Sequence, residues 1–306
     1  MLFVTHIMTS LGFWLQFILS FYLLGSTQCK RIQLQSRIIG GQYVDSKYKY
    51  PYMALIKRYY KENNDKRQST CTGTIVNPSF VLTSAHCLRP EGCTNCTYNK
   101  NTFSVYTGTT KNDKKGDGRK SQVERFHIHP EFERNDTVNK CRNNNDIALV
   151  ELTEPLVLNR ATKVVKLPTA VDYCQLSSSM TTMSTINGDR CTILGWGRTD
   201  THNLIKNTEL KLGRVALIDK EQCSALRNNL CQDTELCTVD PDKETGWCKG
   251  DSGGPVMCNG VQYGVISFGR KDCEKFKIPQ VSQRVDIHIN WINDIIAEHR
   301  RKSKNN

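Results

Sequence analysis

Short apolar runs, separated by polar clusters, recur along most of the chain. The runs are rich in valine, isoleucine, tyrosine and threonine, and glycine, asparagine, aspartate or lysine stands between them. Such runs are typical of β-strands, and many of them in succession favour an antiparallel sandwich or barrel. The predicted strands are 52–56, 73–76, 80–83, 103–107, 147–152, 191–196, 210–217, 255–258 and 264–268.

Helical periodicity is found only near the end of the chain. Val285, Ile289, Ile292 and Ile296 recur at helical spacing and predict a helix over 285–299. Because strands and helices do not alternate, a parallel α/β sheet is not expected. We expect one all-β domain, with two small domains as the alternative. The polar stretches predicted to form surface loops are 57–69, 89–100, 111–120, 133–144 and 175–190.

The first residues differ from the rest of the chain. Residues 11–24 are almost wholly apolar and small residues follow them, which predicts a secretory signal peptide over 1–27. A signal anchor is the alternative, but Gln16 and Ser20 interrupt a stretch that is already shorter than the roughly 20 residues a span needs. We expect a secreted, extracellular protein that is soluble and off the membrane once the signal is removed.

Cysteine content agrees with export. The chain has 14 cysteines, and an oxidising compartment converts pairs of thiols into disulfides. Asn95 and Asn135 each begin an Asn-x-Thr triplet, so both become candidate glycosylation sites if the chain is secreted.

The chain is basic, with a formal charge of +12. Three basic residues and no acid precede Ile38, which lowers this to +9 for the part that begins there. A positive balance attracts acidic partners. The basic residues are scattered through loops such as 111–120 and the tail 300–304, without interleaved aromatic residues, so a solvated surface is expected rather than a nucleic-acid site.

Three motifs supply the groups of a nucleophilic hydrolase. Ser252 stands in Gly-Asp-Ser-Gly-Gly-Pro, His86 in Thr-Ser-Ala-His-Cys, and Asp146 in Asn-Asp-Ile-Ala-Leu. A serine attacks a carbonyl at neutral pH only if a base takes its proton. A histidine serves as that base when a carboxylate fixes its tautomer and stabilises the imidazolium.

Chain order separates two architectures. The glycines around Ser252 also fit the pattern of α/β-hydrolases, in which the acid and the histidine follow the serine. Asp272 and His288 could formally serve in that order, but just 54 of the 306 residues follow Ser252. Because the parallel sheet is also missing, this alternative is set aside.

The order His86, Asp146, Ser252, with these motifs, resembles the chymotrypsin-like family of secreted serine endopeptidases. Arg-Ile-Ile-Gly-Gly at 37–41 is similar to the family's activation junction, so the resemblance extends from 37 to about 299. It implies two six-stranded antiparallel β-barrels with the active site in the cleft between them and a C-terminal helix. His86 would act as general base and then acid, Asp146 would orient it, and the backbone N–H groups of Gly250 and Ser252 would form the oxyanion hole.

The resemblance also implies a zymogen. Residues 28–37 would be an activation propeptide and 38–306 the peptidase domain. Cleavage after Arg37 would free the ammonium of Ile38, which would pair with Asp251 inside the protein and order the site.

Four disulfides are implied by the same resemblance, namely Cys71–Cys87, Cys191–Cys258, Cys223–Cys237 and Cys248–Cys273. Six cysteines fall outside it: Cys29, Cys93, Cys96, Cys141, Cys174 and Cys231. Their connectivity stays open, with Cys29–Cys174 and Cys141–Cys231 preferred. Zinc at Cys93 and Cys96 is the alternative to a disulfide there, but no paired histidine is near.

The expected primary pocket departs from a trypsin-like one. In the family that the chain resembles, the residue six positions before the nucleophile forms the floor of this pocket, and an aspartate there would select arginine or lysine by charge. Here that residue is Gly246. Trp247 and Gln280 take pocket positions usually held by small residues, and Gly269 leaves one wall open. We therefore expect cleavage after uncharged residues.

Further residues surround the expected cleft. Ser267 matches the family segment that hydrogen-bonds the triad aspartate and lines the cleft. The basic residues Lys249, Arg270 and Lys271 would favour acidic groups near the scissile bond, or would act only as rim charges.

No metal or cofactor is expected. His127 and His129 lie at strand spacing without an evident third ligand, and we interpret His202, His288 and His299 as surface or helix positions. The expected partners are protein or peptide substrates, a separate trypsin-like activating protease and protein protease inhibitors, acting on a monomer. The alternatives are a non-catalytic binding protein on this scaffold, with an occluded primary pocket, and a disulfide-rich structural module.

Overall fold

The computed structural model divides into two compact units, residues 1–35 and 36–306. All residues that the structure describes belong to the second unit. They are 38, 41–89, 97–112, 116–132, 144–169, 191–198, 208–227, 233–240, 246–268 and 278–305. The predicted signal peptide and propeptide therefore lie outside the described residues.

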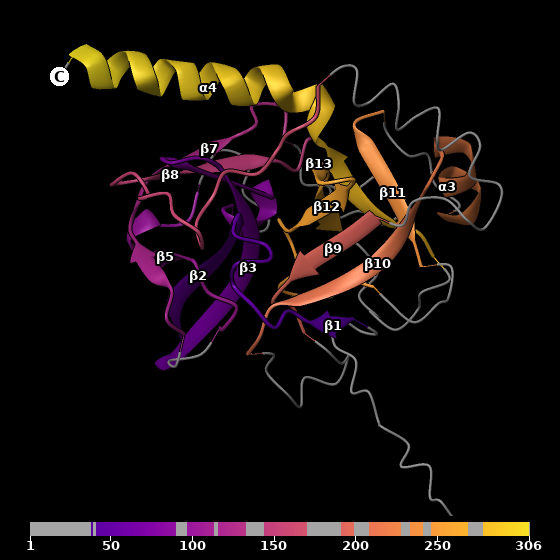
Figure 1. Cartoon of the computed structure of the whole chain (residues 1–306), viewed down its shortest axis with the longest axis horizontal. Coiled ribbons are helices and arrows are strands. Elements are labelled where there is room, and N and C mark those ends of the chain that lie inside the picture. The colour runs from indigo at the N-terminus through magenta and orange to yellow at the C-terminus, as the bar shows by residue number, and fades with distance from the viewer. Residues whose placement is uncertain are drawn as a thin grey trace, which may run out of the picture. The chain divides into compact units, whose positions relative to one another are not determined.

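One β-sheet is built from the N-terminal half of this unit (Figure 1). Its strands are β2 (Met53–Glu62), β3 (Asp65–Asn77), β4 (Phe80–Thr83), β5 (Phe103–Thr107), β6 (Arg119–Ser121), β7 (Val123–Ile128) and β8 (Ala148–Leu152). They pair in the order β6-β5-β2-β3-β4-β8-β7. Only Gln122 separates β6 from β7, so one bent segment holds both ends of the sheet and rolls it into a barrel.

A second sheet is built mainly from the C-terminal half. Its strands are β1 (Gln42–Tyr43), β9 (Cys191–Gly195), β10 (Lys211–Ile218), β11 (Glu235–Val239), β12 (Pro255–Cys258), β13 (Val261–Phe268) and β14 (Gln280–Arg284). They run in the order β1-β10-β11-β14-β13-β12-β9, and β9 also pairs with β10, which closes a barrel. The predicted all-β architecture of two barrels is confirmed.

Apolar side chains fill each barrel and the space between them. Ile56, Phe103 and Val150 belong to a cluster inside the first barrel, while Ile193 and Val256 belong to one inside the second. A further cluster joins the two sheets, since it contains Leu82 of β4, Leu149 of β8, Leu194 of β9 and Met257 of β12. Burial of this joining cluster holds the two barrels against each other.

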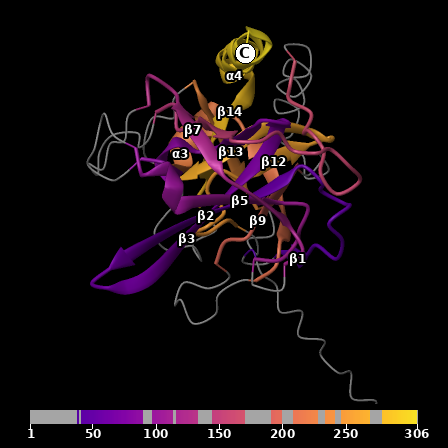
Figure 2. The ribbon, with the colours of Figure 1, turned by 90° about the vertical axis from the view of Figure 1, so that its left-hand side faces the viewer.

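Among the described residues, two α-helices accompany the barrels, α3 (Lys220–Arg227) and the C-terminal α4 (Val285–Asn305), and α4 stands out in Figures 1 and 2. The predicted helix is confirmed and extends beyond 299. Glu151 of β8 ties it to the first barrel, because its carboxylate contacts His299 Nδ1 at 2.9 Å and His127 Nε2 at 2.7 Å. No helix among the described residues has the length and apolar character that crossing a membrane requires.

One sequence interpretation was wrong. Residues 57–69 are not a surface loop, because most of them belong to the β2–β3 hairpin, which turns through Asn63 and Asn64 with positive φ. The hairpin escaped detection since its strands are mostly exposed and polar there. His288 lies on a helix, as one of the two interpretations had it, but only 2% of it is exposed, and nothing in the sequence signalled this burial.

Candidate active site

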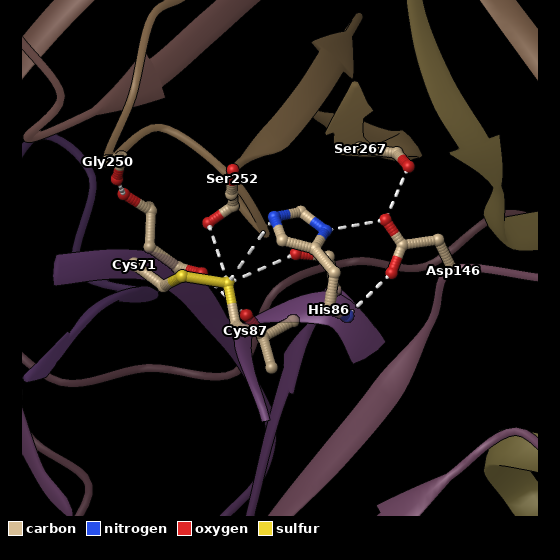
Figure 3. The surroundings of a disulfide bond; sticks show 10 residues. Cys71, His86, Cys87, Asp146, Gly250, Ser252 and Ser267 are labelled. Carbon is tan, nitrogen blue, oxygen red and sulfur yellow. Dashed lines mark hydrogen bonds and ion pairs between the residues drawn. A yellow bond between two sulfur atoms is a disulfide. The ribbon is translucent and has the colours of Figure 1, made fainter. Parts of the chain in front are cut away.

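His86 lies directly after β4, on the short 3-10 helix η1 (Ala85–Cys87). The four residues of β4 are all buried, so the strand fixes where this helix begins. The Cys71–Cys87 disulfide ties the helix to β3, beside the imidazole ring (Figure 3). Strand and disulfide together hold His86 with its ring only partly exposed.

Asp146 is fully buried just before β8 and accepts three hydrogen bonds. Its Oδ1 accepts the backbone N–H of His86 at 2.8 Å, and its Oδ2 lies 2.7 Å from His86 Nδ1. Ser267 Oγ donates to the same Oδ2 at 2.5 Å. Burial alone raises the pKa of Asp146, but the charge and hydrogen bonds of His86 and the bond from Ser267 lower it below its usual value.

Ser252 lies on the side of the His86 ring opposite Asp146 (Figure 3). Its carbonyl accepts the backbone N–H of Thr72 at 2.8 Å, and Thr72 Oγ1 donates to the carbonyl of Gly250 at 3.0 Å. Strand β3 of the first barrel thereby holds the serine turn of the second. The structure brings together His86, Asp146, Ser252 and Ser267, which are four of the predicted site residues.

The glycines next to Ser252 are required by the backbone and by space. Gly250 has φ +104° and Gly253 has φ +82°, a region that other residues rarely adopt. A Cβ at Gly253 would also lie 2.0 Å from Thr83 Oγ1 and 2.2 Å from the carbonyl of Thr72. Close approach of the two barrels at this turn therefore depends on the missing side chain.

Asp251 is buried next to the serine, against the segment 195–197. Its Oδ1 accepts the N–H of Gly197 at 2.7 Å and its Oδ2 accepts the N–H of Cys248 at 2.9 Å. A Cβ at Gly195 or Gly197 would overlap this carboxylate. Burial raises the pKa of Asp251 to about 7, although both backbone bonds and the charge of Lys211 lower it.

Two other buried groups lie in the same part of the second barrel. Ile38 is 1% exposed and belongs to the apolar cluster inside this barrel. Lys211 is fully buried and stands directly opposite Gly195 in the β9–β10 pair, with its Nζ 3.5 Å from the ring centroid of Tyr43. Sequence reasoning missed Lys211, because a lysine in a strand normally predicts exposure.

The predicted pocket residues have different surroundings. Gly246 is buried, and Trp247 is 4% exposed with its side chain in the apolar cluster of the second barrel. The amide of Gln280 bonds the backbone of Trp247 twice, accepting from its N–H at 3.1 Å and donating to its carbonyl at 3.0 Å. Lys249 is exposed. The side-chain amide of Gln280 thus holds the backbone of the predicted pocket segment at Trp247.

Three predicted disulfides are present: Cys71–Cys87, Cys191–Cys258 and Cys223–Cys237. Cys248 is also disulfide-bonded. Several predicted positions lie outside the described residues, namely Arg37, Asn95, Asn135, Gly269, Arg270, Lys271, Cys273 and the cysteines at 29, 93, 96, 141, 174 and 231. Across the described ranges, no three histidine, cysteine or acidic side chains are arranged to hold a metal ion.

Two barrels that hold a serine, a histidine and a buried aspartate in this arrangement define the trypsin-fold class of proteins. The family model described as Trypsin matches residues 38–292. The chain belongs to this family, whose members are serine proteases.

Individual relatives agree with this assignment. The chain is 30% identical to Kallikrein-7 of Homo sapiens over 76% of this chain and 80% of that protein. It is 30% identical to Kallikrein-11 of Mus musculus, over 76% of each chain. It is 28% identical to Tonin of Rattus norvegicus over 87% of this chain and 92% of that protein.

Replacing Gly253 with alanine tests the requirement for close approach. We expect Gly253→Ala to lower the free energy of unfolding far more than Gly260→Ala. Gly260 has a similar φ of +78° but nothing within 4 Å of its Cβ position. In the control Gly260→Ala, the free energy of unfolding should fall only by the cost of placing alanine at a positive φ, about 1–2 kcal/mol. Chemical denaturation measures both, and equal losses would contradict the steric argument.

The raised pKa of Asp251 predicts a pH dependence of stability. The folded chain keeps a proton on this carboxyl that the unfolded chain releases above its usual pKa of 3.8. The contribution of this group to the free energy of unfolding should therefore fall as pH rises from about 4 to about 7, by at most ~4 kcal/mol. Denaturation of the uncleaved Ser252→Ala chain measures this. When Asp251→Asn is added, the fall in the free energy of unfolding that comes from this carboxyl should disappear. If the pH dependence stays the same, the raised pKa of Asp251 is not its cause.

Proposed function

We propose that this protein is a secreted serine endopeptidase that hydrolyses peptide bonds through Ser252, His86 and Asp146. The observation that supports it most is the double contact of the buried Asp146 with the ring and backbone of His86, across the ring from Ser252. A carboxylate on Nδ1 leaves Nε2 free to accept a proton from the serine.

The reaction has two halves. His86 Nε2 removes the proton of Ser252 Oγ as the oxygen attacks the substrate carbonyl, and the oxyanion binds the N–H groups of Gly250 and Ser252. The intermediate collapses to an acyl-enzyme, and His86 passes the proton to the leaving amine. Water then attacks the ester with His86 as base, which releases the acid and restores Ser252.

Domain boundaries follow the sequence. Residues 1–27 are the signal peptide, 28–37 the propeptide and 38–306 the peptidase domain. Secretion makes Asn95 and Asn135 glycosylation sites, and the mature enzyme is an extracellular monomer. It acts on proteins or peptides and meets protein inhibitors there.

Activation occurs by cleavage after Arg37. The surroundings of Asp251 support this step. Its carboxyl is buried, and burial raises its pKa to about 7. The ammonium of Ile38, whose side chain already packs inside the same barrel, pairs with this carboxylate after cleavage. The pair favours the charged form of Asp251 and stabilises the turn that carries Gly250 and Ser252.

Specificity is for an uncharged residue at the cleaved bond. Gly246 supplies no charge at the floor position. The oxygen and the nitrogen of the Gln280 amide both bond the backbone of Trp247. This amide therefore does not replace the negative charge of an aspartate in the pocket. Exposed Lys249 favours acidic groups nearby.

Active-site labelling tests the reaction. A fluorophosphonate should label the chain cleaved after Arg37, and neither Ser252→Ala nor uncleaved Arg37→Gln should label at a comparable rate. Asp146→Asn should lower kcat by about 10³-fold or more, because His86 loses its tautomer control. A folded, cleaved chain without labelling would instead indicate the binding protein on a protease scaffold.

Cleavage profiling tests the pocket. In a peptide library, the activated enzyme should cut after uncharged residues at least about tenfold faster than after arginine or lysine, since Gly246 supplies no carboxylate at the floor position to neutralise a buried cation. The purified wild-type zymogen should not cleave itself at Arg37 and should need a separate trypsin-like protease. Self-cleavage that Ser252→Ala abolishes would refute this specificity.

A further inference from the structure

His288 is a buried titratable group that the proposed reaction does not use. It lies in the first turn of α4, with only 2% of its surface exposed. Its Nε2 is 3.0 Å from Oδ1 of Asn145, the residue that immediately precedes Asp146. The C-terminal helix thereby contacts the loop that carries the buried carboxylate of the site.

The hydrogen bonds around Asn145 fix the orientation of its amide. Nδ2 donates to the carbonyl of Glu131 at 3.2 Å, which leaves Oδ1 facing the histidine. On the other side of the ring, His288 Nδ1 lies 2.6 Å from the carbonyl of Arg284. Both ring nitrogens therefore face acceptors, so each needs a proton to form its bond.

Only one of these protons is present at neutral pH. Burial lowers the pKa of His288, although the bond to Arg284 and the charges of Asp286 and Glu131 raise it and the charge of Arg284 lowers it. His129, with ring centroids 5.0 Å apart, packs edge to face against it, and burial lowers the pKa of His129 to about 4. A neutral ring donates to Asn145 or to Arg284, and a second proton in acid satisfies both.

Asn145 transmits this contact through its backbone. Its φ is +50°, in the left-handed region that asparagine tolerates better than most residues. Its carbonyl accepts the N–H of Ile147 at 2.7 Å, which forms a tight turn around Asp146. A shift of the Asn145 side chain therefore changes the direction in which the carboxylate of Asp146 points.

We propose that His288 is a positioning residue for the reaction: in the neutral tautomer that carries its proton on Nε2, the bond to Asn145 holds the turn that aims Asp146 at His86. This inference rests on the proposed function. His288 touches neither Ser252 nor His86 in any described contact, so its influence passes through its neighbours. Asn145 precedes Asp146, while His129, whose ring packs against His288, donates its backbone N–H to the carbonyl of Ile147, which follows Asp146. His288→Phe keeps an aromatic ring beside His129, so it tests the contact with Asn145.

Kinetics of the cleaved enzyme test the proposal with three matched variants. His288→Phe keeps an aromatic ring but removes the donor, while His288→Gln restores an N–H without a titratable group. His299→Phe is the control, since His299 lies on the same helix as His288 but contacts Glu151 of β8 and not Asn145. Rates are expressed per labelled active site, so loss of folded protein does not count.

We expect His288→Phe to lower kcat about tenfold with KM changed less than twofold, because the acyl-transfer geometry loosens while substrate contacts remain. The acid limb of kcat/KM should also move to lower pH, since a misplaced carboxylate stabilises the His86 imidazolium less. His288→Gln should recover most of kcat. A purely structural role would change the amount of labelled enzyme but leave kcat and the acid limb in place, and that result would overturn the proposal.

Asn145→Gly breaks the same contact from the other side and accepts the positive φ. It should reproduce the kinetic change, and adding His288→Phe should have no further effect, whereas additive losses would contradict the route through Asn145. If His288→Phe does not fold, the Asn145→Gly result decides alone.

A second readout does not depend on activity. In the Ser252→Ala chain with ¹⁵N-labelled histidine, the Nδ1–H resonance of His86 reports its bond to Asp146. It should shift in His288→Phe and stay in place in His299→Phe, and equal spectra would overturn the inference. If the parent enzyme fails to label while this shift occurs, the proposed function fails and the positioning contact stands.

Discussion

The structure depends most on one buried carboxylate, that of Asp146. A carboxylate removed from water is stable only if hydrogen bonds replace its hydration, and here His86 and Ser267 supply them from different barrels. The same bonds that satisfy Asp146 therefore join the barrels and orient the imidazole. Stability of the site and readiness for proton transfer have a common origin.

The buried carboxyl of Asp251, directly before Ser252, differs from that of Asp146 in its electrostatic surroundings. Two backbone N–H groups reach it, yet its pKa is raised by burial, whereas that of Asp146 is lowered by its partners. The carboxylate of Asp146 already has its partners in the structure, whereas the carboxyl of Asp251 would become more readily charged beside an added cation. Under the proposed activation by cleavage after Arg37, the contact between His86 and Asp146 is therefore present before cleavage, while Asp251 responds to the new ammonium.

Apolar runs, helical spacing and glycine-flanked motifs are local signatures, so the sequence predicted most of the strands, the C-terminal helix and the group around Ser252. The two barrels were implied by the family resemblance, since apolar runs alone left a sandwich or a barrel open. The sequence did not predict the exposed arms of the β2–β3 hairpin, whose polar residues pair through the backbone. It also missed Thr72, Lys211 and the contact of His288 with Asn145, because each depends on segments far apart in the chain. No periodicity within one segment reports which distant segment buries it.

The position of α4 at the end of the chain has a consequence for biosynthesis. His86 and Asp146 are translated long before Ser252, and the helix that bears His288 and His299 emerges last of the folded elements. A nascent chain on the ribosome, or a product truncated before Val285, lacks the contacts that Oδ1 of Asn145 and one oxygen of Glu151 make with this helix. The loop that carries Asp146 therefore acquires these contacts only after the C-terminal helix has been synthesised.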